Sequence, residues 1–313
     1  GDPQGRGQPS PRLRINPDAA FSVGISVNTD VVTVLVTDLA CNVVEEIRFE
    51  TQPLSRDITL QKLKRILAEI QENRGLQADK LLGIGFAISG FFVKRGEQIN
   101  APEPLKDWSL RPLHAELENY FRTPVWLENG ATTGAIGESL VGAGLTYENF
   151  GYLAFNYGFG GGLVLSGKPF FGSHGNAGEL SAVLRPEEIE NRPGLGSLVG
   201  ELNDAGHEIR SMLELQERFD LNWPQASYWI EQVTPQLERI IHALTAIIDP
   251  QAIVFGGEIP RELAKALIKG HRFWHDERYQ ANRPMPDMIV SSLENDSSAL
   301  GAALLPLKSE YFI

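Results

Sequence analysis

Three segments of the sequence contain residue types that could bind or transfer a phosphoryl group. They are Glu128-Asn129-Gly130, Asn176-Ala-Gly-Glu179, and a glycine-rich stretch from Gly158 to Gly162. Phosphoryl transfer needs a base beside the attacking hydroxyl, a carboxylate that organises Mg²⁺, and backbone amides around the phosphates. Glycines can supply such amides, but the stretch from Gly158 to Gly162 fits a tight hairpin equally well. The residues alone therefore leave two interpretations of this stretch open, a phosphate-binding loop and a tight hairpin.

A histidine pair, His271 and His275, has the i, i+4 spacing at which two side chains on one helix face can ligate a metal. Asp276 and Glu277 follow the pair, but Gly270 precedes it and no third ligand is obvious. We therefore interpret this stretch as a polar surface segment and predict no metal site.

The composition is that of an ordinary globular protein, and its charge argues against direct contact with nucleic acid. The chain has 313 residues, 42% of them hydrophobic, and a net charge of -12. Phosphate backbones are bound by clustered Lys and Arg, so this fragment is not expected to grip DNA by itself. The single cysteine, Cys41, excludes an internal disulfide and a zinc cluster of several cysteines, and fits a cytoplasmic protein. No apolar run is long enough for a membrane span, and no signal peptide is visible.

The first 20 residues are predicted to be a linker, because they are rich in Gly, Pro and Arg and poor in apolar side chains. The chain begins at Gly1 instead of Met, which suggests a processed or truncated chain that extends upstream in its native form. A solvated tail is the alternative interpretation of this composition.

Hydrophobic patterning predicts two α/β lobes, at residues 21–130 and 131–313. In the first lobe, β-branched runs and helical spacing predict the order β-β-β-α-β, with elements at 21–27, 31–36, 41–49, 58–72 and 81–88. A helix at 112–121, a strand at 125–127 and a helix at 131–141 follow. The three short-turned strands at the start imply an antiparallel meander.

The second lobe is predicted to repeat this order with added helices. A hairpin from Tyr152 passes through a Gly158–Gly162 turn into residues 163–165, and the chain then reaches 169–171. Later elements are expected at 195–204, 208–219, 225–248, 252–255, 261–268, 288–291 and 297–307. Glu294-Asn-Asp296 is predicted to cap the final helix, which could pack back on the first lobe. Two such lobes facing a cleft define the actin-like, hexokinase-like (ribonuclease H-like) fold.

The order and spacing of several short motifs resemble the ROK family of repressors, open reading frames and sugar kinases. The strongest likeness is Tyr152 to Glu179, a glycine-rich signature that runs into Ala-Gly-Glu. Other matching segments are Gly83-Ile-Gly85, Asn100-Ala-Pro102 with Trp108, Ala135-Ile-Gly-Glu138, Gly256-Gly257 and Leu300-Gly-Ala-Ala303. The resemblance also indicates what the predicted linker connects. The segment from Gly5 to Asp18 is similar to the join that follows the winged helix-turn-helix in the family's repressors.

At the positions where the family's kinases carry catalytic and nucleotide-binding groups, this sequence departs from the pattern. The resemblance implies an aspartate base directly after Asn129, but Gly130 occupies that position and has no side chain to accept a proton. An acid and a glycine of the first-strand motif are replaced at Ser26 and Asn28, and Asp30 is displaced from the expected place. We expect a degenerate nucleotide site without Mg-ATP, formed by Ser26, Asn28, Gly158, Gly160, Gly256 and Gly257. Asn156-Tyr157 stands where small residues would let a phosphate approach, and Tyr157 is expected to crowd it.

The sugar-binding pattern of the family is only partly present. Asn129 and Glu179 match family sugar contacts, and Ser89 and Gly130 complete the candidate effector site. Leu180-Ser-Ala182 supplies no histidine where the family has a zinc ligand. The zinc loop corresponds to residues 192–199, which contain no cysteine, and Val199 stands where a further sugar-binding Glu is expected. Zinc is therefore predicted to be absent. The alternative to a ligand contact is that Glu179 caps a helix.

These observations favour one of three hypotheses. The first is a transcriptional regulator whose effector-binding region forms a homo-oligomer, a dimer by resemblance, that binds a small molecule such as a sugar and reaches DNA only through an upstream domain. The second is an active ATP-dependent sugar kinase, with Glu128 or Asp30 as poor replacement bases. The third is a pseudokinase scaffold that binds no ligand and serves only in oligomerisation. The linker and Gly130 favour the first.

Overall fold

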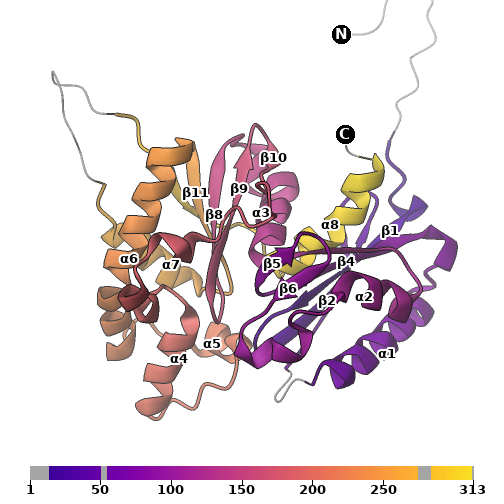
Figure 1. Ribbon diagram of the computed structural model, residues 1–313, viewed down its shortest axis with the longest axis horizontal. Coiled ribbons are helices and arrows are strands. Elements are labelled where there is room, and N and C mark those ends of the chain that lie inside the picture. The colour runs from indigo at the N-terminus through magenta and orange to yellow at the C-terminus, as the bar shows by residue number, and fades with distance from the viewer. Residues whose placement is uncertain (1–13, 51–54, 274–282, 312–313) are drawn as a thin grey trace, which may run out of the picture.

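The protein consists of two α/β lobes, each built on a five-stranded sheet (Figure 1). The computed structural model describes residues 14–50, 55–273 and 283–311. The first sheet has the order β3-β2-β1-β4-β7 and the second the order β10-β9-β8-β11-β12. In each sheet the three strands that come first in the chain form an antiparallel meander. In the first sheet β4 lies parallel to β1 and β7 parallel to β4, and in the second β11 lies parallel to β8 and β12 parallel to β11. The actin-like repeat predicted from element order is therefore confirmed.

The first lobe contains a core of β-branched and aromatic side chains from its sheet and the helices that cover it. Its strands are β1 (Phe21–Val27), β2 (Val31–Asp38), β3 (Val43–Glu50), β4 (Leu81–Ile88) and β7 (Val125–Asn129), and its helices are α1 (Arg56–Arg74) and α2 (Leu113–Phe121). A two-stranded ribbon, β5 (Phe91–Lys94) and β6 (Gln98–Asn100), is inserted after β4. The sequence patterns did not predict this ribbon.

The second lobe repeats the meander and adds a helical layer with its own core. The strands are β8 (Phe150–Phe155), β9 (Phe159–Leu165), β10 (Lys168–Pro169), β11 (Ala252–Gly257) and β12 (Asp287–Val290). The helices are α4 (Leu195–Asp204), α5 (Met212–Arg218), α6 (Pro224–Ile248) and α7 (Arg261–Gly270). The long amphipathic α6 buries the apolar side predicted for it, including Val233, Leu237 and Ile241.

Two helices join the lobes: α3 (Gly130–Val141) and α8 (Ser297–Tyr311) pack on each other at the centre of the molecule (Figure 1). The C-terminal helix α8 lies against β1, β2 and β4 of the first sheet, whereas α3 contacts β9 of the second sheet. Glycines make this close approach possible. A Cβ atom on Gly24 or Gly85 would lie less than 3.0 Å from the backbone of α8.

The hairpin between β8 and β9 turns earlier than predicted. Gly160, Gly161 and Gly162 lie within β9, where they pair with Ala154, Leu153 and Tyr152 of β8, so the turn is at residues 156–158. The reason is packing: a Cβ atom on Gly162 would lie less than 3.0 Å from Ala135 of α3, and Gly160 faces Ala131. These glycines therefore allow a helix to pack closely on a strand.

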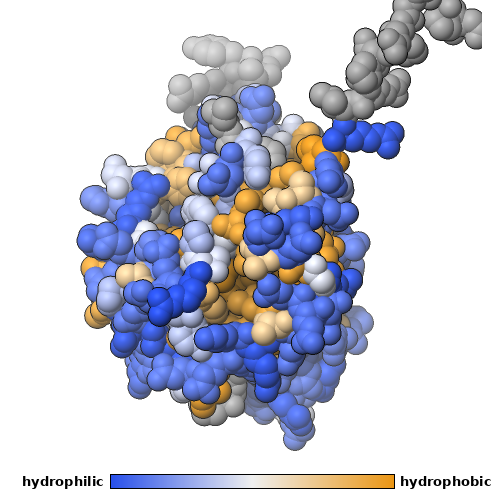
Figure 2. Space-filling view, turned by 90° about the vertical axis from the view of Figure 1, so that its right-hand side faces the viewer, coloured by the Kyte–Doolittle hydropathy of each residue, from blue (hydrophilic) through white to orange (hydrophobic). Residues whose placement is uncertain are grey.

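The free end of the first lobe is shown in Figure 2, where polar residues cover most of the surface and an apolar strip lies in a hollow near the middle. Between α1 and the first sheet there is also a cavity of about 240 Å³, lined mainly by apolar side chains such as Phe21, Leu67 and Ile84. None of the helices within the described residues is both long and apolar enough to cross a membrane.

Candidate functional site

A small pocket between the lobes brings together three of the predicted effector contacts: Ser89, Asn129 and Glu179. Ser89 directly follows β4 and Asn129 ends β7, and these parallel strands pair Ile88 with Asn129. Their carboxyl ends therefore meet at one edge of the sheet, which is where open α/β sheets bind ligands. The pocket has a volume of about 210 Å³ and is lined by Ser89, Gly90, Phe91, Pro102, Asn129, Ala131, Ala154, Asn156, Gly158, Phe159, Gly160, Glu179 and Arg192.

Asn129 has a structural task as well as a place in this pocket. Its side-chain oxygen Oδ1 accepts hydrogen bonds from the backbone N–H groups of Ala131 (2.7 Å) and Thr132 (3.2 Å), and so caps α3. Its Nδ2 donates one hydrogen bond to the carbonyl of Gly90. Because an amide nitrogen carries two hydrogens, one N–H of Asn129 remains available to a ligand.

Gly130, the fourth predicted effector residue, lies beside the pocket and does not line it. It is buried as the first residue of α3, and its carbonyl accepts hydrogen bonds from the hydroxyls of Ser298 (2.8 Å) and Thr133 (2.9 Å). A Cβ atom added there would meet Ser298 Oγ at 3.7 Å and Asn28 Oδ1 at 3.9 Å. A side chain would fit at this position, but because the residue is glycine none is present.

Glu179 reaches the pocket from a loop of the second lobe that is fixed to the ribbon of the first. Asn176 Oδ1 accepts a hydrogen bond from the backbone N–H of Phe92 (2.7 Å), and its Nδ2 donates to the Phe92 carbonyl (2.9 Å). Glu179 precedes the 3-10 helix Leu180–Val183 without making a side-chain capping bond, so the alternative role as a cap is not seen. The residue is exposed, yet the protein around its carboxyl displaces water and raises its pKa.

A second, larger cavity of about 500 Å³ lies next to this pocket, and Gly256 and Gly257 at the end of β11 line it. Gly257 has a φ of 83°, and a Cβ atom there would overlap Asn156. Asn156 lines both cavities, and its Oδ1 accepts a hydrogen bond from the N–H of Glu258 (3.2 Å). Of the six residues expected to form a degenerate nucleotide site, Gly256 and Gly257 line this cavity.

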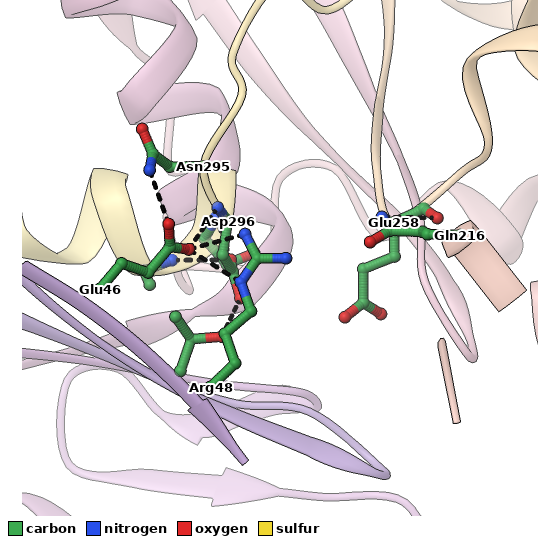
Figure 3. Close-up of polar contacts among 9 residues, drawn as sticks. Glu46, Arg48, Gln216, Glu258, Asn295 and Asp296 are labelled. Atoms are coloured by element: carbon green, nitrogen blue, oxygen red, sulfur yellow. Dashed lines mark hydrogen bonds and ion pairs between the residues drawn. The ribbon is translucent and has the colours of Figure 1, made fainter. Parts of the chain in front are cut away.

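A network of charged and amide side chains occupies one wall of the larger cavity (Figure 3). Glu46 Oε1 accepts hydrogen bonds from Arg48 Nε (2.8 Å) and from the N–H of Asp296 (3.1 Å), and its Oε2 accepts one from Asn295 (2.6 Å). Burial favours the protonated form of Glu46, but these hydrogen bonds and the charge of Arg48 outweigh it, so the pKa of Glu46 is lowered. Asp296 caps α8 as predicted, through hydrogen bonds from the N–H groups of Ser298 (2.9 Å) and Ala299 (3.0 Å).

Glu258 faces this wall from the second lobe and keeps its carboxylate apart from the network (Figure 3). The residue is 8% exposed, and its Oε2 has no hydrogen-bond partner among the described residues. Burial, together with the nearby charges of Asp30 and Asp296, raises its pKa well above the ordinary value. Asp30 itself accepts a hydrogen bond from the N–H of Met212 (2.7 Å), which ties the first lobe to α5.

The six residues predicted to form a degenerate nucleotide site do not all line one cavity. Gly256 and Gly257 line the larger cavity, but Gly158 and Gly160 line the smaller pocket. Ser26 and Asn28 are buried and line neither one. Because the hairpin turns at residues 156–158, Gly160 and Gly162 face α3, and Gly158 and Gly160 line the smaller pocket.

The structure also places three other residues that the sequence analysis singled out. Tyr157 was expected to crowd a phosphate, but it lines neither cavity and its ring lies against Gly196 of α4. Val199 is buried in the helical core of the second lobe. Glu128 points toward a separate pocket with Arg95 and His114, and burial raises its pKa to about 7.

The predicted polar segment around His271 is only partly described. His271 is 8% exposed, so it is not on the surface, and its ring lies 5.7 Å from that of His242. Neither ring nitrogen of His271 has a hydrogen-bond partner among the described residues. Residues 275–277 lie outside the described part of the chain. Across residues 14–50, 55–273 and 283–311, no group of three or more His, Cys, Asp or Glu could hold a metal ion.

Several lining residues were not recognised as ligand contacts from sequence. Arg192 lines the smaller pocket, and Arg48 and Glu258 line the larger cavity. Arg48 is on β3 and Glu258 directly follows β11, so they come together only through the contact between lobes. A charged residue directly after a buried strand, as at Glu258, is the one local signal that could have identified them.

The chain belongs to the ROK family. The family profile matches residues 22–188 and 196–309, which is most of the chain. The structure agrees with this assignment, because it is similar to a ROK family glucokinase from Streptomyces griseus, solved in complex with glucose and AMPPNP. The TM-score is 0.76 at 19% identity, over 91% of this chain and 99% of that one. At this identity the likeness shows the actin-like fold alone.

Two curated relatives extend the comparison. The uncharacterized protein y4fQ of Sinorhizobium fredii is 26% identical over 308 residues, which cover 98% of this chain and 78% of that protein. The xylose repressor of Caldicellulosiruptor bescii is 28% identical over 172 residues, which cover 54% of this chain and 42% of the repressor. The match thus spans less than half the length of the repressor. The family contains both repressors and sugar kinases, so membership by itself does not decide between them.

Proposed function

We propose that this chain is the effector-binding and oligomerisation region of a ROK-type transcriptional regulator, and that it does not transfer phosphate. The observation that carries the proposal is Gly130, which follows Asn129 at the start of α3 and presents no carboxylate. Among the residues that line the smaller pocket, Glu179 is the one carboxylate, and it comes from the opposite lobe as an expected ligand contact. A bound hydroxyl would therefore find acceptors but no base in the kinase position.

The larger cavity supports the same proposal by its charge. Glu258, Glu294 and Asp296 line it together with Arg48 and Arg261. Arg48 already forms an ion pair with Glu46 at 2.6 Å, so its charge is partly satisfied inside the protein. A nucleoside triphosphate would bring several negative charges next to these acidic residues, which is unfavourable.

In the regulator, a small molecule such as a sugar would bind between Ser89, Asn129 and Glu179 and favour one relative position of the lobes. A ligand can shift such an equilibrium only if it binds one closure state more tightly than the other. A homodimer would carry this change to DNA through a domain outside this chain, in the cytoplasm. Similarity to a xylose repressor supports this role.

An active sugar kinase is the second candidate, favoured by the likeness to a glucokinase structure and by the cavity at Gly256 and Gly257. A scaffold without a ligand is the third candidate. It is supported by Asn129, whose side chain already makes three hydrogen bonds within the protein.

A thermal-shift screen against sugars and sugar phosphates, each with and without Mg-ATP, separates the three. A ligand at a hundredfold excess over its Kd adds about 2.7 kcal/mol to the free energy of unfolding. We expect a shift with a sugar compound and none with Mg-ATP, and no sugar-dependent ADP release in a coupled assay. Sugar-dependent turnover would establish the kinase instead. A complete absence of shifts would support the ligand-free scaffold.

A further inference from the structure

The smaller pocket contains one positive and one negative side chain that do not neutralise each other. Arg192 follows the 3-10 helix Pro186–Asn191, and Glu179 comes from the loop after β10; both line the pocket. The guanidinium of Arg192 donates one hydrogen bond, from Nη1 to the carbonyl of Ile189 (3.1 Å). Among the described residues it forms no ion pair. Most of its five N–H groups are therefore available.

Among the described residues no ion pair joins Arg192 to Glu179, so the two charges are separate. In keeping with this, the protein around the Glu179 carboxyl displaces water and raises its pKa. Where an arginine does pair with a glutamate in this chain, as Arg239 does with Glu188, the arginine contributes to a lowered pKa. Arg192 and Glu179 thus offer two distinct binding points in one pocket.

The other polar groups of the pocket suit hydroxyls. Asn129 has one free N–H to donate, as its remaining amide groups are bonded to the protein. Ser89 donates its hydroxyl hydrogen to Asn28 (3.4 Å), which leaves its lone pairs as acceptors. Glu179 accepts when it is ionised. Donors and acceptors of this kind match the hydroxyls of a single sugar ring, and a pocket of about 210 Å³ admits a ligand of that size.

An arginine has a particular preference among ligands. Its planar guanidinium binds phosphate or carboxylate through two parallel hydrogen bonds, which neutral hydroxyls cannot match. Neutral sugars would leave the guanidinium without an anionic partner.

We propose that the effector is an anionic sugar, whose hydroxyls contact Glu179, Asn129 and Ser89 and whose anionic group binds Arg192. The anionic group is a phosphate ester or a carboxylate, since the same guanidinium fits both. This inference rests on the proposed function, because it names the ligand class of the effector pocket.

Isothermal titration calorimetry on the full chain tests the proposal. The probes are glucose, xylose and N-acetylglucosamine, each beside its terminal phosphate ester and its sugar acid. We expect one anionic form to bind at least about tenfold more tightly than its neutral parent. The phosphate and acid arms show which anion is recognised.

The variant Arg192→Met should remove this preference, so that the anionic form and its neutral parent bind with similar affinity, and Arg192→Lys should keep part of it. Arg185→Met, on an exposed arginine seven residues earlier that lines none of the described pockets, is the matched control and should change nothing. Circular dichroism would confirm that each variant folds.

The outcomes distinguish this inference from the proposed function. Equal affinity for neutral and anionic forms, or an unchanged preference in Arg192→Met, overturns the anionic ligand but leaves a sugar-binding regulator intact. Failure of every probe to bind overturns both. Binding of an anionic sugar that is lost in Arg192→Met and retained in Arg185→Met supports both.

Discussion

Asn176 and Phe92 are joined by a pair of hydrogen bonds that link the two lobes beside the effector pocket. The amide of Asn176 accepts from the backbone N–H of Phe92 at 2.7 Å and donates to its carbonyl at 2.9 Å. Phe92 belongs to the ribbon that follows Ser89, and Asn176 lies three residues before Glu179. One side chain therefore fixes the distance between two walls of the pocket.

Replacing Asn176 by alanine should loosen this link. Two hydrogen bonds worth about 0.5–1.5 kcal/mol each would be lost, so we expect the free energy of unfolding to fall by about 1–3 kcal/mol. Affinity for the effector should fall too, because Glu179 would no longer be held at its place. Urea unfolding and calorimetry measure the two effects. Asn222→Ala, which removes only an exposed side-chain hydrogen bond to Asp220, is the control; equal losses in both variants would contradict a special role for Asn176.

Gly130→Asp tests whether a missing base is the only obstacle to phosphoryl transfer. The position accepts a Cβ atom without overlap, and an acidic side chain in the first turn of α3 interacts favourably with the helix dipole. We expect a folded protein with a Tm within a few degrees of the parent, and sugar-dependent ADP release at background. Ser26 and Asn28 still lack a carboxylate for Mg²⁺, and Glu258 still faces the larger cavity.

A matched variant at the same helix, Gly134→Asp, should unfold the protein, because its Cβ atom would lie less than 3.0 Å from the ring of Tyr152. Turnover by Gly130→Asp would show that the cleft still binds Mg-ATP productively. The parent protein would then be an inactivated kinase that lacks only its base.

The order of elements could be predicted because local patterns determine it. Runs such as Val31 to Val36 are β-branched, and α6 shows a clear apolar face, so both types of element are recognisable in a single sequence. The final helix was expected to be able to pack back on the first lobe, and α8 does lie against the first sheet. The residues that permit this contact, Gly24 and Gly85, carry no local signal of it, because their role depends on a helix distant in sequence.

The candidate site could be predicted where residues end neighbouring strands. Ser89 and Asn129 follow β4 and β7, and parallel pairing brings them together. Gly158 and Gly160 were grouped with Gly256 and Gly257, but they line the smaller pocket and not the larger cavity. A glycine-rich hairpin can turn at several positions, and only packing against α3 selects one. Arg192 lies in a connection without periodicity, so its direction could not be inferred.

Glu128 should make the stability of the protein depend on pH near neutrality. Burial raises its pKa from 4.5 to about 7, so between these values the folded protein holds a proton that the unfolded chain has lost. Its contribution to stability is present below pH 4.5 and is lost as the pH rises through about 7. Glu128→Gln should remove this loss and stabilise the protein above pH 7 by up to about 3 kcal/mol.

Urea unfolding of both proteins between pH 5 and pH 8 measures the difference, which isolates Glu128 from other titrating groups. The exposed Glu187→Gln serves as the control and should follow the parent at every pH. A constant gap between the Glu128→Gln variant and the parent across this range would mean that Glu128 is ionised at both ends.

Substitutions at two glycines of the hairpin distinguish a packing role from a phosphate-binding role. Gly161 lies in β9, where an added Cβ atom would be less than 3.0 Å from Leu180 Cδ1 and from the carbonyl of Tyr152, whereas Gly158 at the turn has no atom within 4 Å of that position. Neither glycine has a positive φ, so alanine differs only by its methyl group. We expect Gly161→Ala to cost about 1–3 kcal/mol and Gly158→Ala to stay within about 0.5 kcal/mol of the parent in urea unfolding. If the glycine-rich stretch were a mobile phosphate loop, both methyl groups would be tolerated equally and the two unfolding midpoints would coincide.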